Sequence, residues 1–237
     1  MSSACSTRSD GSRRTWRDNI CCLGGIDVTQ ILIVLTVLIA SLSVHEAAHA
    51  FAADRLGDPT ARHLGRLSIN PAVHVDPIGT LLFPLIAFIT GLPLIGWAKP
   101  VPVDPRHLRH PKRDFALIAA AGPASNLVMA TMGAIAMAVI PGAAPGEIAV
   151  RAVVGPLFQV LNLFVYVNVL LAVFNMIPVP PLDGGNVLLG VAPAPVARII
   201  EQLRPYGFLI LYALMLTGVL STLLGPVANY LRYVLGV

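Results

Sequence analysis

Two histidines and a glutamate, His45, Glu46 and His49, have the residue types and spacing best suited to chemistry in this chain. In a helix, residues i and i+4 lie on one face about one turn apart, so the two imidazoles can bind one zinc ion. Glu46 lies beside them as a candidate general base. The motif therefore predicts a catalytic metal site, and the rest of the chain must supply its setting.

That setting is a membrane. Of the 237 residues, 56% are apolar and only 12% charged, with a mean hydropathy of +0.76, whereas soluble domains carry about 25% charged residues. Several apolar runs approach or exceed the ~18 to 20 residues needed to cross a bilayer. We expect an all-α, multi-pass integral membrane protein embedded in the lipid bilayer.

The net charge of +4 does not indicate a nucleic-acid partner. The basic residues lie in short loops between apolar segments, with few aromatic residues among them. This distribution is typical of membrane-topology signals. The sequence predicts no particular oligomeric state.

We expect about four transmembrane helices, at residues 27–55, 115–140, 154–176 and 207–235. Gly225-Pro226 should bend or end the last one. Residues 79–98 are apolar but contain five glycines and prolines, which favours a broken or re-entrant segment. Before it, residues 57–78 predict a structured loop with a small β-prone piece at 66–69. Residues 186–206 are expected to be a short polar connection.

These elements give three regions. Residues 1–25 are rich in Ser, Arg and Gly and predict a flexible tail. Residues 26–206 form the membrane-embedded core that carries the metal site, and residues 207–237 form a C-terminal transmembrane segment.

A catalytic zinc usually takes a third protein ligand. The extended motif of one soluble protease class is absent, because Ala52 and Arg55 replace its glycine and histidine. Asp183 is the best candidate, since it directly follows the third span and a carboxylate near the bilayer is costly unless paired or metal-bound. The alternative is a turn aspartate, because Asp-Gly is a common turn pair.

The three candidate zinc ligands must lie at the same depth in the membrane. His45 and His49 lie near the end of the first span and Asp183 just after the third, so they share one depth only if residues 79–98 do not cross the bilayer. The loops on that side, 55–114 and 177–206, carry ten Lys or Arg, against six elsewhere. The positive-inside rule then places the site toward the cytoplasm.

Three motifs in order resemble the site-2 protease family of intramembrane zinc metalloproteases. The first is His45-Glu46-Ala47-Ala48-His49. The second is Gly122-Pro123-x-x-Asn126, and the third is Asn175-x-x-Pro178-x-Pro180-x-x-Asp183-Gly184. The resemblance covers about residues 30–190 and is to compact bacterial members, without an inserted PDZ domain or terminal CBS domains.

The resemblance implies a role for each matching position. One zinc ion per chain would be bound by His45, His49 and Asp183, with Glu46 as catalytic base. Among the residues expected to serve substrate binding, Asn175, Pro178 and Pro180 would lie near the substrate, while Asn126 would support the active-site core.

The expected function is hydrolysis of peptide bonds within or near transmembrane segments of membrane-protein substrates, in a bacterial cell (inner) membrane. A membrane zinc-binding or ion-transport protein is the main alternative, and a non-catalytic scaffold is another. Glu46 favours the protease, because a transporter needs no base beside a two-histidine zinc helix.

Overall fold

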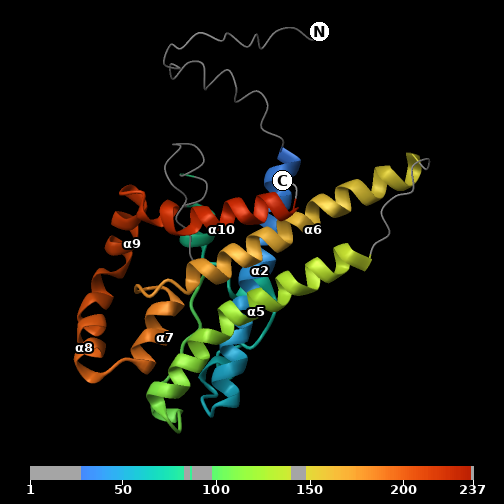
Figure 1. Cartoon of the computed structure of the whole chain (residues 1–237). Helices are drawn as coiled ribbons and strands as arrows, with labels where there is room; N and C mark the ends of the chain where they lie inside the picture. Colours follow the sequence, from blue (N-terminus) through green and yellow to red (C-terminus); the bar gives the residue numbers. More distant parts are fainter. Residues whose placement is uncertain (1–27, 83–85, 87–97, 140–147, 236–237) are drawn as a thin grey trace.

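Three long helices and a C-terminal group of shorter ones make up the protein, seen in a computed structural model that describes residues 28–82, 86, 98–139 and 148–235. The long helices are α2 (Val28–Arg55), α5 (Pro111–Val139) and α6 (Ile148–Asn175). The C-terminal group is α7 (Asp183–Val191), α8 (Ala194–Leu203), α9 (Gly207–Leu216) and α10 (Val219–Leu235). Short helical turns connect them: α3 (Thr60–His63), η2 (Pro71–Val73), η3 (Pro77–Leu82), η4 (Pro105–His107) and η5 (Arg204–Tyr206). Figure 1 shows this arrangement.

Within the described residues, four helical segments are long and apolar enough to cross a membrane: Leu32–Arg55, Pro111–Val139, Gly155–Asn175 and Ala194–Leu216. The first three coincide with the predicted spans, and the all-α fold class is confirmed. The chain is an integral membrane protein.

Helix α5 is central, because it packs against α2, α6 and α7. Its buried residues recur every three or four positions and include small ones at Ala119, Gly122, Ala130 and Gly133. A β-carbon at Gly133 would lie 2.9 Å from the side chain of Val165 in α6. Small residues therefore let the helix backbones approach closely, as membrane helices require.

The C-terminal part differs from the prediction in two ways. Residues 186–206 are not a polar connection, since they contain most of α7 and all of α8. Residues 207–235 are not one span, because the helix breaks at Gly218, whose φ of 75° is a left-handed conformation that glycine adopts without steric cost. Helix α10 then continues through Pro226 and packs against α6.

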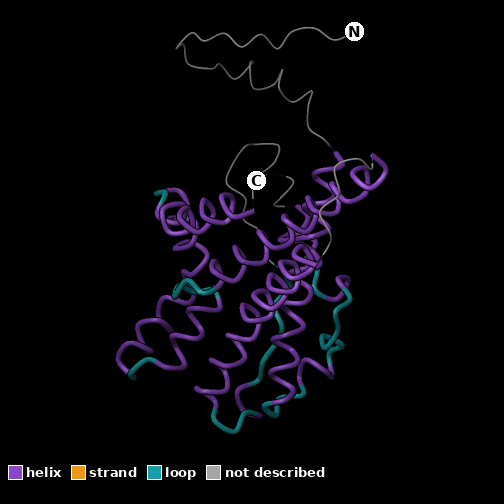
Figure 2. The backbone as a smooth tube through the Cα atoms, turned by 45° about the vertical axis from the view of Figure 1, so that its right-hand side comes forward, coloured by secondary structure: helices purple, strands orange, loops and turns teal. Residues whose placement is uncertain are grey.

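The loop between α2 and α5 contains no β-strand in its described part, where residues 66–69 are irregular with a bend at 67–68 (Figure 2). Most of the predicted re-entrant segment, 79–98, lies outside the described residues, as does the N-terminal tail. However, the N–H of Lys99 donates a hydrogen bond to the carbonyl oxygen of His74 at 2.8 Å.

Candidate metal centre and active site

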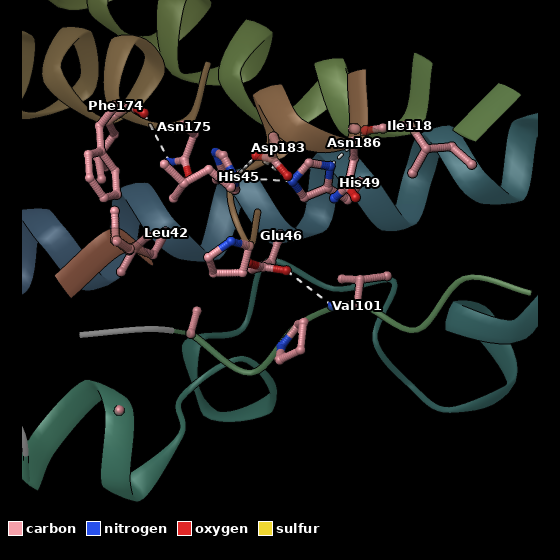
Figure 3. Close-up of a pocket in the computed structure, with 18 of the residues that line it drawn as sticks. Leu42, His45, Glu46, His49, Val101, Ile118, Phe174, Asn175, Asp183 and Asn186 are labelled. Carbon is pink, nitrogen blue, oxygen red and sulfur yellow. Dashed lines mark hydrogen bonds and ion pairs between the residues drawn. The ribbon is translucent and has the colours of Figure 1, made fainter. Parts of the chain in front are cut away.

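Three candidate ligand atoms converge between α2 and α7 (Figure 3). Nε2 of His45 lies 3.0 Å from Nε2 of His49. Oδ2 of Asp183 lies 3.1 Å from the first and 3.4 Å from the second. The two imidazole rings are nearly perpendicular, at 85°. The structure thus brings together the three residues that the sequence suggested as zinc ligands.

The other nitrogen of each ring is held by a hydrogen-bond acceptor. Nδ1 of His45 is 2.5 Å from Oδ1 of Asn126, and Nδ1 of His49 is 2.7 Å from the backbone carbonyl oxygen of Ile118. Because a carbonyl oxygen can only accept, each Nδ1 carries the hydrogen and donates it. Both Nε2 atoms therefore present lone pairs to the centre, as metal-binding histidines do.

The donor set fits zinc. Two nitrogen lone pairs and a carboxylate oxygen face one another, and Oδ2 of Asp183 is buried without a hydrogen bond from any described residue. Such a group of acceptors is repulsive unless a cation binds among them. A tetrahedral zinc ion with bonds of about 2.0 to 2.1 Å would separate its ligand atoms by about 3.3 Å. The three observed separations lie close to this value.

Glycines create the space for this geometry. A β-carbon at Gly122 would lie 2.3 Å from Nε2 of His49 and 2.6 Å from Cε1 of His45. Next to Asp183, a β-carbon at Gly184 would lie 2.3 Å from the carbonyl oxygen of Met176. Gly122 therefore allows α5 to approach the imidazoles closely, and Gly184 allows the start of α7 to pack against the backbone at the end of α6.

Glu46 points away from the three ligands, toward Val101 in the loop before α5 (Figure 3). Its Oε2 accepts a hydrogen bond from the N–H of Val101 at 3.2 Å. The 98–104 segment that carries Val101 is fixed at one end by Lys99 and at the other by Asp104, whose N–H donates to Oδ2 of Asp58 at 2.7 Å. The loop thus positions the candidate base.

Asp58 is a fully buried carboxylate. Burial raises the pKa of Asp58, but hydrogen bonds from Thr60, from the N–H of Asp104 and from His107 offset this, and its pKa is lower than usual. The charged form is therefore the one that holds the loop.

A cavity of about 610 Å³ extends from the three ligands and Glu46 along the membrane helices. Its walls are mostly apolar, with Leu38 and Leu42 from α2 and Phe174 from α6. Asn175 and Asn186 contribute amides. The C-terminal helices complete the wall: Phe208, Leu211, Met215 and Leu220. The C-terminal helices α9 and α10 therefore contribute to the wall of the site.

The remaining predicted residues take different positions. Asn175 lines the cavity, with its amide nitrogen donating to the carbonyl oxygen of Leu171 at 3.0 Å. Pro178 is exposed and Pro180 is buried against Gly185 and Gly207, and neither lines the cavity. Asn126 is fully buried and contacts His45. This contact agrees with the expectation that Asn126 supports the active-site core, and its role in substrate binding stays a prediction.

Sequence reasoning missed several members of the site. Val101 and Ile118 act through backbone atoms, which leave no signature in residue type. Asn168 is fully buried and binds Asn126. It had two available signals: a buried amide in an apolar span is costly, and it lies seven residues before Asn175, on the same helix face.

Comparisons with known proteins agree with this geometry. Residues 143–218, which include Asp183, match the model of Peptidase family M50. The chain is 36% identical over 196 residues to "Putative zinc metalloprotease YwhC" of Bacillus subtilis, an alignment covering 83% of this chain and 85% of that protein. The chain belongs to peptidase family M50.

A second relative is "Putative zinc metalloprotease Rip2" of Mycolicibacterium smegmatis, 28% identical over 194 residues, covering 80% of this chain and 69% of that protein. No solved structure matches the chain. The resemblance to the site-2 protease family is confirmed, and the coarser function follows: this M50 chain is a membrane metalloprotease.

Proposed function

We propose that this M50 chain is an intramembrane zinc endopeptidase of the site-2 type, which cleaves membrane proteins within or near their transmembrane segments. One zinc ion per chain would be bound by His45, His49 and Asp183. The observation that carries the proposal is the position of this donor set and of Glu46 at the wall of an apolar cavity between membrane helices.

Zinc in this position would polarise a peptide carbonyl and lower the pKa of water at the open position toward ~7. Glu46 is the base that accepts a proton from the attacking water and later donates it to the leaving amine. The hydrogen bond from Val101 fixes the Glu46 carboxylate within the same cavity. The apolar walls limit access of bulk water to the site.

The cavity lining supports an apolar peptide as substrate. A transmembrane helix satisfies its backbone hydrogen bonds internally, so it must unwind locally before it can be cut. The amide nitrogen of Asn175 donates to Leu171, which leaves its oxygen to accept an N–H group exposed by unwinding. Asn175 would thus stabilise the opened substrate.

Charge and the relatives support a proposal for the location. The segments next to the site, 55–114 and 177–206, carry ten of the sixteen Lys and Arg residues of the chain. The relatives named above are bacterial. Both support a bacterial inner membrane, with the site toward the cytoplasm.

Replacement of Glu46 by Gln tests the proposal. Purified Glu46→Gln protein should bind zinc like wild type but fail to cleave a membrane-protein substrate in detergent or in vesicles. Glu201→Gln, which removes an exposed carboxylate on α8, should cleave normally. Cleavage by Glu46→Gln at the wild-type rate would falsify the protease mechanism. Zinc transport into vesicles without any cleavage would instead favour the membrane zinc-transport alternative.

A further inference from the structure

We propose that Asn168 is a positioning residue for the metal centre: through Asn126, it sets which nitrogen of His45 carries the hydrogen. The proposal rests on the zinc site described above. It assigns a task to a buried amide that belongs to none of the three sequence motifs.

A continuous chain of hydrogen bonds joins three membrane helices. Nδ2 of Asn168 in α6 donates to Oγ of Ser41 in α2 at 2.9 Å. Oδ1 of Asn168 accepts from Nδ2 of Asn126 in α5 at 2.8 Å. Oδ1 of Asn126 then lies 2.5 Å from Nδ1 of His45, back in α2. Ser41, Asn126 and Asn168 have no exposed surface.

The donor and acceptor order of these hydrogen bonds is fixed at the Asn168 end. Nδ2 of Asn168 also donates to the backbone carbonyl oxygen of Phe164 at 2.8 Å. A backbone carbonyl can only accept, so the amide nitrogen of Asn168 must face Phe164. Its oxygen must then face Asn126.

The orientation of the Asn168 amide determines the tautomer of His45. Because the oxygen of Asn168 faces Asn126, Asn126 must present its NH₂ group to Asn168 and its oxygen to His45. Nδ1 of His45 then donates, and Nε2 keeps the lone pair that binds metal. A reversed Asn126 amide would donate to Nδ1 and place the hydrogen on Nε2, the ligand atom.

Because the two amides are buried, the reversed orientation of Asn126 is costly. Unpaired amides between membrane helices are costly, so reversal of Asn126 alone would bring its carbonyl oxygen against that of Asn168, two acceptors without a donor between them. Such a closed network holds one arrangement of hydrogen bonds. Apolar residues of similar size could pack the same space but would leave the Asn126 amide free to reverse.

The test is zinc affinity of purified protein, measured by competition with a chromophoric chelator, together with the visible spectrum of the Co²⁺-loaded protein. Asn168→Leu should weaken zinc binding by on the order of tenfold or more and shift the Co²⁺ bands. Asn162→Leu is the matched control, because it removes another amide from α6 whose oxygen has no partner among the described residues. It should leave both readouts unchanged.

Wild-type zinc affinity in folded Asn168→Leu would overturn the role of Asn168. If that variant does not fold, isosteric Asn168→Asp decides: its oxygen still accepts from Asn126, so zinc affinity should stay within about threefold of wild type. A loss as large as that of Asn126→Leu would overturn the proposal. Wild-type protein that binds no zinc would instead refute the metal site itself.

Discussion

Gly122 lies directly against the imidazole of His49, so that a β-carbon at Gly122 would be 2.3 Å from Nε2. The same β-carbon would be 2.6 Å from His45. Real β-carbons essentially never approach other atoms so closely. Since Gly122 is buried in the middle of α5, the absence of a side chain there is a requirement of the metal centre.

Gly122→Ala should therefore displace both imidazoles. We expect zinc affinity to fall on the order of tenfold or more, with loss of cleavage. The added methyl should also destabilise the fold by about 1 to 3 kcal/mol through overpacking. Zinc competition and thermal unfolding in detergent measure the two effects. Gly155→Ala in α6 is the control, because its β-carbon would meet no atom within 4 Å. Equal zinc affinity in the two variants would refute the steric argument.

Removal of zinc should destabilise the wild-type protein. The two Nε2 atoms and Oδ2 of Asp183 repel one another without a cation among them, and a ligand that binds only the folded state stabilises it. Zinc at 100 times its dissociation constant should contribute about 2.7 kcal/mol. A chelator should lower the unfolding temperature of wild type but not of the double variant His45→Ala, His49→Ala. An identical response of both proteins would show that zinc binds elsewhere.

Much of this site could be predicted from sequence, because its signals are strong and local. The spacing of His45 and His49 follows from helix geometry, and the three long spans follow from the length of their apolar runs. Asp183 stood out because few acidic residues occur next to a span.

Other features depend on contacts that residue types do not encode. The break at Gly218 is one residue with a positive φ inside a long apolar run. Ile118 holds His49 through a backbone carbonyl oxygen, which any residue has. Pro178 and Pro180 belong to a motif, yet neither lines the cavity, whereas the neighbouring Pro181 and Leu182 do. The prediction failed where tertiary packing decided the outcome.

The loop that positions Glu46 should depend on Asp58. Asp58→Asn removes the negative charge that the N–H of Asp104 and the side chains of Thr60 and His107 contact. Hydrogen bonds to charged groups contribute about 1.5 to 3 kcal/mol each, so the variant should unfold at a lower temperature. Cleavage should also slow, because the segment carrying Val101 is less firmly held. Unchanged unfolding and cleavage would show that the loop is anchored without Asp58.

The contribution of the Asp58 carboxylate to the stability of the folded protein should depend on pH. The pKa of Asp58 is lowered in the folded protein, so its carboxylate contributes stability that is fully present above the ordinary aspartate pKa of about 3.9. That contribution is lost as pH falls through the lowered pKa. The difference in unfolding temperature between wild type and Asp58→Asn should therefore narrow as pH falls below about 4. A difference that widens in acid would contradict this sign.

Met215 in α9 lines the cavity, and a larger side chain there should obstruct the substrate. We expect Met215→Trp to lower kcat/KM for a membrane substrate by at least about tenfold, which corresponds to about 1.4 kcal/mol. Zinc affinity should not change, because the ligands lie on α2 and α7. Met132→Trp is the control, since Met132 is 65% exposed on α5 and lies outside the cavity. Full cleavage by Met215→Trp would show that the substrate reaches Glu46 without passing α9, and would remove the C-terminal helices from the substrate path.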